Sequence, residues 1–307
     1  MSCWGARDDG HCRALTRRFV LRARHCRCCR QRRYLRPLRI RPVTVLAALL
    51  AILTALAQPA HAQKLQARYV ISMTGIRVGQ SAWTVKMDAE HYSVSASGGS
   101  VDIINVLLRG EGSAEAAGDI RNGRLVPATF SSSLVEDGQK IDLKMTMEDG
   151  IVTAVKENGP PPGPDRVPLT QAHAQGVIDP LSALLIPNEA SDNTTIAQES
   201  CSRTLAIFDG RRRYDLVLSF KRMEVLRGND YAGRALVCNV ILRPIAGHRA
   251  DSVIMKYVAG RRDMEIFFAP ITGTRFLAPL RLLVPTLIGT MAVQATSFEI
   301  TAAPQPN

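Results

Sequence analysis

The chain has 307 residues, of which 46% are hydrophobic, and a formal net charge of +12. Nearly all of this charge lies in residues 1–42, which hold 13 Arg and no Lys against two Asp. The rest carries 26 Lys and Arg against 25 Asp and Glu, so we exclude a domain that is basic throughout. The arginine-rich segment would bind nucleic acid only if it stayed attached, and we predict no nucleic-acid partner.

An apolar stretch, residues 43–57, follows the basic residues and leads to Ala60-His61-Ala62. A basic segment, an apolar run and a pair of small residues are typical of a secretory signal peptide. We expect cleavage between Ala62 and Gln63 and export to the periplasm of a bacterial cell envelope. Residues 1–62 are then a leader, and a mis-set translation start is the simpler interpretation of residues 1–34.

The sequence disfavours three alternatives to a cleaved secretory signal. A membrane anchor needs roughly 20 apolar residues, more than this stretch holds. A lipoprotein would need Cys where Gln63 stands, and the twin-arginine pair Arg17-Arg18 lies far ahead of the apolar run. The cluster Cys26-Arg27-Cys28-Cys29 has no second ligand pair, so we predict no zinc site. The mature chain is predicted to have no transmembrane span.

About 245 residues remain after cleavage, and only Cys201 and Cys238 among them are cysteines. Two cysteines in an oxidising periplasm favour a disulfide, although two buried thiols remain an alternative. We expect residues 63–300 to form one domain and residues 301–307 a disordered tail.

Alternation of apolar and polar residues with a period of two predicts strands through most of this domain. In the first part these are residues 67–73, 80–87, 91–97, 129–134, 141–147 and 151–155. The pairs Asp137-Gly138 and Asp149-Gly150 favour hairpin turns, because both turn positions need positive φ. These neighbouring strands should therefore be antiparallel.

A proline-rich loop, residues 159–164, and a short helix interrupt the strands. Asp179 has the position of an N-cap, and Pro180 that of the first helical residue. Further strands are predicted near Leu205 and Ile207 and over residues 213–220, 235–242, 252–258, 263–269 and 291–300. Pro279 and Pro285 predict that the segment between the last two strands is an edge strand or a loop.

These patterns predict an all-β protein, an antiparallel, strongly curved sheet or barrel-like fold with one short helix. The residues Gly176-Val177-Ile178-Asp179-Pro180, the two cysteines, Phe208-Asp209-Gly210 with its following arginines, and residues 285–290 with Phe298 resemble the exported proteobacterial family of unknown function numbered 3108. The resemblance spans nearly all of residues 63–300. It implies an exported, mostly antiparallel β protein and supplies no activity.

Catalytic signatures do not stand out in the sequence. The mature chain has His91, His173 and His248, whose spacing requires no metal site, and it lacks the serine and zinc hydrolase motifs. We therefore predict no catalytic residues, no metal and no cofactor, and favour a protein that is not an enzyme.

Two features favour binding. Arg211, Arg212 and Arg213 follow a tight turn and form a candidate site for an anionic group, with a solvated turn paired to Asp209 or Asp215 as the alternative. Residues 101–108 and 276–288 have more Leu, Ile and Val than a half-solvated strand needs, so they line an apolar cavity or fill the core.

The leading hypothesis is a periplasmic binder of an apolar or amphipathic envelope component, such as a lipid. A structural or assembly partner of another envelope protein is the alternative, and an envelope hydrolase comes third.

Overall fold

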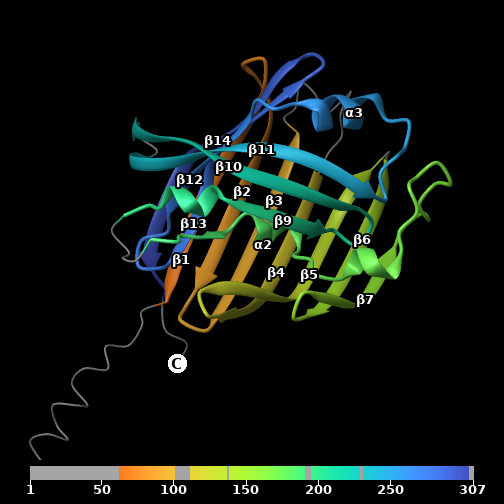
Figure 1. Ribbon diagram of the computed structural model, residues 1–307, viewed down its shortest axis with the longest axis horizontal. Coiled ribbons are helices and arrows are strands. Elements are labelled where there is room, and N and C mark those ends of the chain that lie inside the picture. Colours follow the sequence, from red (N-terminus) through yellow and green to blue (C-terminus); the bar gives the residue numbers. More distant parts are fainter. Residues whose placement is uncertain (1–61, 101–110, 137, 191–194, 229–230, 304–307) are drawn as a thin grey trace, which may run out of the picture. The chain divides into compact units, whose positions relative to one another are not determined.

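The computed structural model describes residues 62–100, 111–136, 138–190, 195–228 and 231–303. All of them belong to one compact unit, Pro59–Asn307. The predicted all-β class is confirmed, because this unit is built on a single antiparallel sheet of 14 strands (Figure 1).

The sheet consists of two meanders joined through their outer strands. The first meander contains β1 (Gln63–Met73), β2 (Ile76–Met87), β3 (His91–Ser100), β4 (Glu111–Arg121), β5 (Arg124–Glu136), β6 (Gln139–Glu148) and β7 (Ile151–Asn158). The second contains β9 (Arg203–Phe208), β10 (Arg213–Arg227), β11 (Ala232–Ala246), β12 (Met264–Pro270), β13 (Phe276–Thr286) and β14 (Gly289–Ala302). Pairing of β1 with β14 joins them, which leaves β7 and β9 as the two ends of the sheet.

Short helical segments connect the meanders. They are the 3-10 turns η1 (Gln171–Ala174) and η2 (Gln198–Cys201) and the helix α2 (Pro180–Ala183), with the two-residue strand β8 (Ile186–Pro187) paired to β13. The predicted cap is confirmed: the Asp179 carboxylate accepts hydrogen bonds from the backbone N–H groups of Leu181 and Ser182, and Pro180 opens the helix. In Figure 1, β10 and β11 cross over the strands of the first meander, and α2 contacts β3, β4 and β9.

Turn chemistry explains why the first meander forms. Asp149-Gly150, which the sequence predicts as a hairpin turn, has positive φ at both positions, as do Thr74-Gly75 and Asn122-Gly123. Such turns match the right-handed twist of the strands that they join. Each strand therefore returns beside the preceding one.

The prediction of a strand over residues 252–258 is wrong. These residues form the helix α3 (Val253–Gly260), in which the Ser252 side chain caps the N–H of Met255. The sequence Val-Ile-Met-Lys-Tyr-Val has high strand propensity, but the cap and the contacts of α3 with β11 and β13 override that preference. The fold thus has a second helix beyond the single one predicted.

The prediction that Pro279 and Pro285 confine their segment to an edge or a loop is also wrong. They lie in β13, which pairs with β12 on one side and with β14 on the other. The ladder accommodates Pro279 because the register shifts between Phe267 and Phe268, and Pro285 lies at the hairpin end opposite Thr290. The next strand, β14, continues to Ala302, so Thr301 and Ala302 pair with β1 instead of belonging to a disordered tail.

The main core lies between the two meanders. Cross-strand register places Leu65, Val85, Val94, Ala116, Phe130 and Met145 in one buried row across β1–β6. Side chains of the second meander pack into the same cluster, among them Phe208, Val237, Phe267 and Ala278. A second cluster around Leu236, Cys238 and Phe268 covers the opposite face of the second meander. Burial on both faces explains the continuous apolar runs of β11 and β12.

Ladder pairing does not join β7 to β9 among the described residues. The segment before α2 lies beside both ends of the sheet instead. Val177 donates its N–H to Gly150 at the start of β7, and Ile178 forms a parallel bridge with Ile207 of β9. We call this region, residues 176–179 with the β9–β10 turn and the end of β7, the seam.

Candidate functional site

The β9–β10 turn carries the three predicted arginines. The Asp209 carboxylate accepts hydrogen bonds from the backbone N–H groups of Arg211 and Arg212, at 2.8 and 2.6 Å. Gly210 has φ of +94°, and a side chain there would meet Leu143 of β6. These constraints make Phe208-Asp209-Gly210 the predicted tight turn and fix it against the first meander.

Arg211 crosses the seam. Its Nη2 lies 2.8 Å from Glu157 Oε1 at the end of β7 and also donates a hydrogen bond to the carbonyl of Pro160, at 2.5 Å. The Arg211 side chain is only 9% exposed, so these contacts are largely shielded from solvent. The residue connects the predicted proline-rich loop to the turn before β10.

The other two arginines differ from Arg211 and from each other. Arg213 Nη1 contacts Asp215 Oδ1 at 2.6 Å and the carbonyl of Tyr214 at 2.7 Å. Arg212 is about one-third exposed, and its Nη1 lies 3.8 Å from Asp209 Oδ2. The carboxylates of Asp209 and Asp215, which the sequence offers as partners for a solvated turn, therefore do pair with arginines. Lys221 and Arg222 of β10 contact Glu265, and Arg261 contacts Asp263.

A hollow of about 650 Å³ lies on the inner face of the first meander, beyond the core. The row Ser81, Gly98, Gly112 and Leu134 is in register across β2–β5, and Ala96 pairs with Ala114 in the next row. Small side chains in adjacent rows leave space above the sheet, because alternate residues of each strand point to the same face. Short side chains on the inner face therefore leave the space of the hollow, and the register of β1 and β2 shifts beside it at Val78.

Apolar groups dominate the lining of this hollow, which includes Ile71, Val78, Ala96, Ala114 and Leu134. Of the three predicted arginines, Arg212 lines it, which brings a cation to an apolar surface. Glu111 also borders the hollow, but the register places it on the opposite face of β4 from Gly112. The arrangement can receive an apolar chain and an anionic group at the Arg212 side.

Of the two apolar segments that the sequence singles out, the structure describes only the second. Residues 101–108 lie outside the described residues. Residues 276–286 form β13, whose first five residues are all buried and belong mostly to the two core clusters. The sequence signal that does locate the hollow is the run of Ser, Ala and Gly in β3 and β4.

A buried polar group lies next to the seam at the start of α2. Asp179 is fully buried, its Oδ1 caps α2, and its Oδ2 has no hydrogen-bond partner in the structure. Burial raises the pKa of this carboxyl. Nearby, Tyr92 and Ser182 share a hydrogen bond of 2.7 Å, and burial together with the charge of Asp179 raises the pKa of the Tyr92 hydroxyl. Sequence reasoning identified Asp179 as a cap but not as a buried acid.

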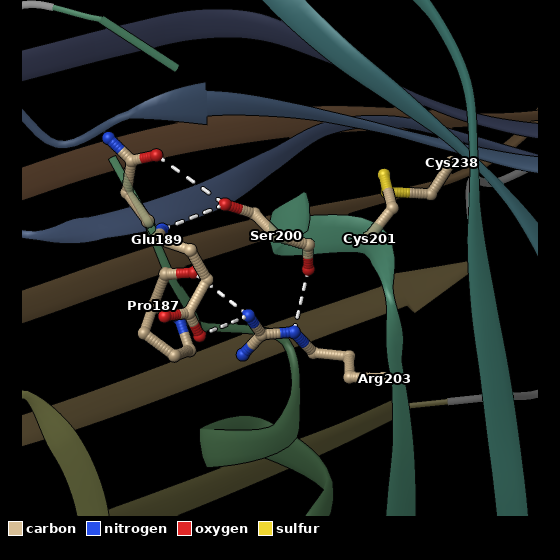
Figure 2. The surroundings of a disulfide bond; sticks show 7 residues. Pro187, Glu189, Ser200, Cys201, Arg203 and Cys238 are labelled. Carbon is tan, nitrogen blue, oxygen red and sulfur yellow. Dashed lines mark hydrogen bonds and ion pairs between the residues drawn. A yellow bond between two sulfur atoms is a disulfide. The ribbon is translucent and has the colours of Figure 1, made fainter. Parts of the chain in front are cut away.

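The predicted pair Cys201 and Cys238 forms a disulfide between η2 and β11, with the two Cα atoms 5.6 Å apart (Figure 2). Arg203 organises the surroundings of this bond. It donates to the carbonyls of Ser200 and Pro187 at 2.6 and 3.2 Å, and to Glu189 at 2.9 Å (Figure 2). The disulfide and Arg203 together hold the segment after α2 against the second meander.

The remaining sequence candidates do not converge. His91 is exposed in β3, His173 lies in η1, and His248 follows β11. Within the described ranges, no group of three His, Cys, Asp or Glu side chains is arranged to hold a metal ion. The helices in this part of the chain are all too short or too polar to cross a membrane. Of the predicted cleavage residues, Ala60 lies outside the described residues, Ala62 precedes the sheet and Gln63 is the first residue of β1.

One family model, of unknown function, matches most of the chain. No curated protein matches it. Among solved structures, it is similar to a β-barrel-like protein of the DUF1849 family from Brucella abortus, at 8% sequence identity and a TM-score of 0.43, over 80% of this chain and 100% of that one. The model of the family "Protein of unknown function (DUF3108)" matches residues 68–296. The chain therefore belongs to the DUF3108 family.

Proposed function

We propose that this protein is exported to the periplasm and binds an amphipathic component of the cell envelope in the inner hollow, as a carrier without enzymatic activity. The observation that carries the proposal is the apolar hollow of about 650 Å³ with Arg212 in its lining. Its volume is within the roughly 300–1,000 Å³ typical of small-molecule sites. An acyl chain would occupy the space above Ala96 and Ala114, with its acidic head at Arg212.

Export is supported by two features. The predicted cleavage after Ala62 would leave Gln63, the first residue of β1, so a cleaved chain would keep the whole sheet. The bond between Cys201 and Cys238 is of the kind that persists in oxidising compartments. Expression of the full chain, cell fractionation and N-terminal sequencing test this part. We expect a periplasmic protein that begins at Gln63, and a cytoplasmic, uncleaved product would overturn it.

Ligand binding is tested with dansylaminoundecanoic acid, whose emission increases in an apolar site. Ala114→Phe places a ring in the hollow and should lower the affinity at least about tenfold, equivalent to ~1.4 kcal/mol. The matched control is Ala117→Phe, on the outer face of the same strand, which should bind as the wild type does. Equal affinity of the Ala114→Phe variant, or no binding by the wild type, would overturn the proposal.

The role of Arg212 is tested with a change of charge. Arg212→Gln should weaken binding of the carboxylate probe by about fivefold, because a partly exposed charged hydrogen bond contributes about 1 kcal/mol. Competition by dodecanol, which has no charge, should be the same for both proteins. A fivefold loss for dodecanol as well would assign Arg212 to the shape of the hollow, and not to recognition of an anion.

A second candidate function is assembly with another envelope protein through β7. This strand pairs with β6 alone in the described sheet, and its apolar residues Ile151 and Val155 are exposed. An exposed edge of this kind can accept a strand from a partner. Native mass spectrometry of the protein purified from the periplasm separates the candidates. A bound lipid supports the carrier, whereas a stoichiometric protein that is lost in the Ile151→Lys, Val155→Lys variant supports assembly.

A further inference from the structure

Two hairpin turns lie side by side at the end of the sheet where β1 and β14 pair. Met73 of β1 is opposite Met291 of β14, and Thr74 donates its N–H to the carbonyl of Thr290 at 3.0 Å. The β1–β2 turn and the β13–β14 turn are therefore adjacent. Both reach beyond the paired strands at the same end of the molecule (Figure 1).

Large apolar side chains occupy these turns and face solvent. Ile76 is 66% exposed, Leu287 is 54% exposed and Ile288 is 75% exposed. Leu287 and Ile288 form a two-residue loop between Thr286 and Gly289, a position where Gly, Asn and Asp are the usual residues. Neither turn chemistry nor core packing accounts for them. We call Ile76, Leu287 and Ile288 the apolar tips.

The charges around the apolar tips have one sign. Arg77 follows Ile76 and is exposed, while the turn residues 73–77 and 286–291 contain no Asp or Glu. The Arg77 side chain also donates to Gln80 of the same strand. Apolar side chains next to a cation are the combination that partitions into the headgroup region of an anionic bilayer.

Helix α3 adds to this end of the molecule. Its Val258 packs in the same cluster as Val284 of β13, which is opposite Met291 near the β13–β14 turn. The first turn of α3 exposes Val253 and Ile254, each 67% exposed, and no residue of the helix is buried. Lys256 is exposed near them, and the exposed acidic residues Asp251 and Asp263 flank the helix. The first turn of α3 thus adds apolar surface to the same end.

We propose that the apolar tips, with α3 beside them, dock this protein on a lipid bilayer that carries anionic headgroups. Ile71 and Val78, which line the hollow, belong to the strands on either side of the β1–β2 turn. Docking would therefore bring the hollow close to the bilayer. Transfer of an amphipathic molecule between the two rests on the proposed function, but docking itself does not.

Flotation of vesicles tests the proposal. The wild type, purified after expression of the full chain, should float with vesicles of phosphatidylethanolamine and phosphatidylglycerol, and much less with vesicles of phosphatidylcholine. The Ile76→Ser, Leu287→Ser, Ile288→Ser variant should lose at least about tenfold in partitioning, since each side chain loses most of its apolar area. Arg77→Gln should reduce flotation with the anionic vesicles and leave flotation with the phosphatidylcholine vesicles unchanged.

A matched control keeps the result specific. The Ile151→Ser, Val155→Ser, Val225→Ser variant removes apolar side chains that are exposed in β7 and β10, away from the tips, and should float as the wild type does. Both variants should keep the wild-type melting temperature. In addition, the Leu287→Trp variant should show a blue shift of its tryptophan emission when vesicles are added.

The proposal is overturned if the wild type does not float with anionic vesicles, or if the tip variant floats as well as the wild type does. Self-association of the wild type that the tip variant loses, without flotation, would assign the tips to a protein interface and overturn docking on lipid. Binding of the dansyl probe without vesicles is measured in parallel. Loss of flotation with intact probe binding separates failure of docking from failure of the proposed ligand site.

Discussion

Arg211 and Glu157 form an ion pair of 2.8 Å that joins the turn before β10 to the end of β7. These residues are 54 positions apart in the chain and lie near opposite ends of the strand order. Together with Val177 and Ile178, the pair spans a gap that no strand ladder closes within the described sheet. The pair is thus part of the architecture of the seam.

Replacing Arg211 by Met should destabilise the protein strongly. The substitution leaves Glu157, which is 24% exposed, without its partner, and it removes the donor to Pro160. Loss of one member of this partly buried pair, together with the bond to Pro160, costs about 2 kcal/mol, less than for a fully buried pair. Urea unfolding measures the loss, and Arg212→Gln, at the more exposed neighbour, is the control with an expected change below about 1 kcal/mol. Equal effects of the two substitutions would contradict the role of Arg211 at the seam.

Asp179 should make stability depend on pH. Burial raises the pKa of its carboxyl in the folded state above the value of about 3.9 in an unfolded chain. The folded state therefore binds the proton more tightly, and the free energy of unfolding falls as the pH rises from about 4 through the folded pKa. Asp179→Asn should abolish this decrease, since an amide does not ionise.

Two substitutions of Asp179 separate the contribution of the helix cap to stability from that of the carboxylate charge. Asn can still accept hydrogen bonds from the N–H groups of Leu181 and Ser182 with its amide oxygen, whereas Ala cannot. We expect Asp179→Ala to be less stable than Asp179→Asn by about 1 kcal/mol at every pH. Urea unfolding of the three proteins between pH 4 and 8 measures both effects. If the free energies of unfolding of the wild type and of Asp179→Asn changed with pH in parallel, the pH dependence would not come from Asp179.

Removing the disulfide should lower stability through the unfolded state. Cys201 and Cys238 are 37 residues apart, and closing a loop of this length stabilises a protein by about 4 kcal/mol in the chain-entropy model. The Cys201→Ser, Cys238→Ser variant should unfold at lower urea concentration in oxidising buffer. The reduced wild type should behave as the variant does, and an unchanged unfolding midpoint would argue against the bond.

Gly247 should not tolerate a side chain. Its φ is +79°, and a Cβ there would clash with the carbonyl oxygen of Arg211. We expect Gly247→Ala to cost more than about 2 kcal/mol, the sum of a left-handed conformation and a steric clash. Gly123→Ala is the matched control, because Gly123 has φ of +71° with open space around it, and it should cost only about 1 kcal/mol. Equal unfolding free energies would show that the β11 end and the arginine turn are not in close contact.

Local patterns predicted most elements of the fold. Alternation located nearly all of the strands, Asp149-Gly150 marked its hairpin, and Asp179-Pro180 marked the start of α2. The strand β4 and the end of β14 were not predicted, and the errors at α3 and β13 have a common cause. Contacts with β11 and β13 favour the helix α3, and a register shift in the pairing with β12 accommodates Pro279 in β13. In both cases the deciding residues belong to other strands.

The candidate site was less accessible to sequence reasoning. The arginine cluster was recognised as a group, but its members have different surroundings: Arg211 lies at the seam, Arg213 pairs with Asp215, and Arg212 lines the hollow. No local pattern distinguishes three consecutive arginines. Residues from distant strands surround each of them, and these depend on the register of the sheet.

By itself, the sequence determined the strand content, the turns, the cap of α2 and the cysteine pair, because neighbouring residues or simple spacing specify each of these. Only the tertiary structure decided where the two meanders meet, which arginine faces the hollow and where the apolar tips gather. These features depend on pairing between β1 and β14 and on contacts across the seam. Such contacts join residues far apart in the chain, so their geometry arises from packing and register and not from any local pattern.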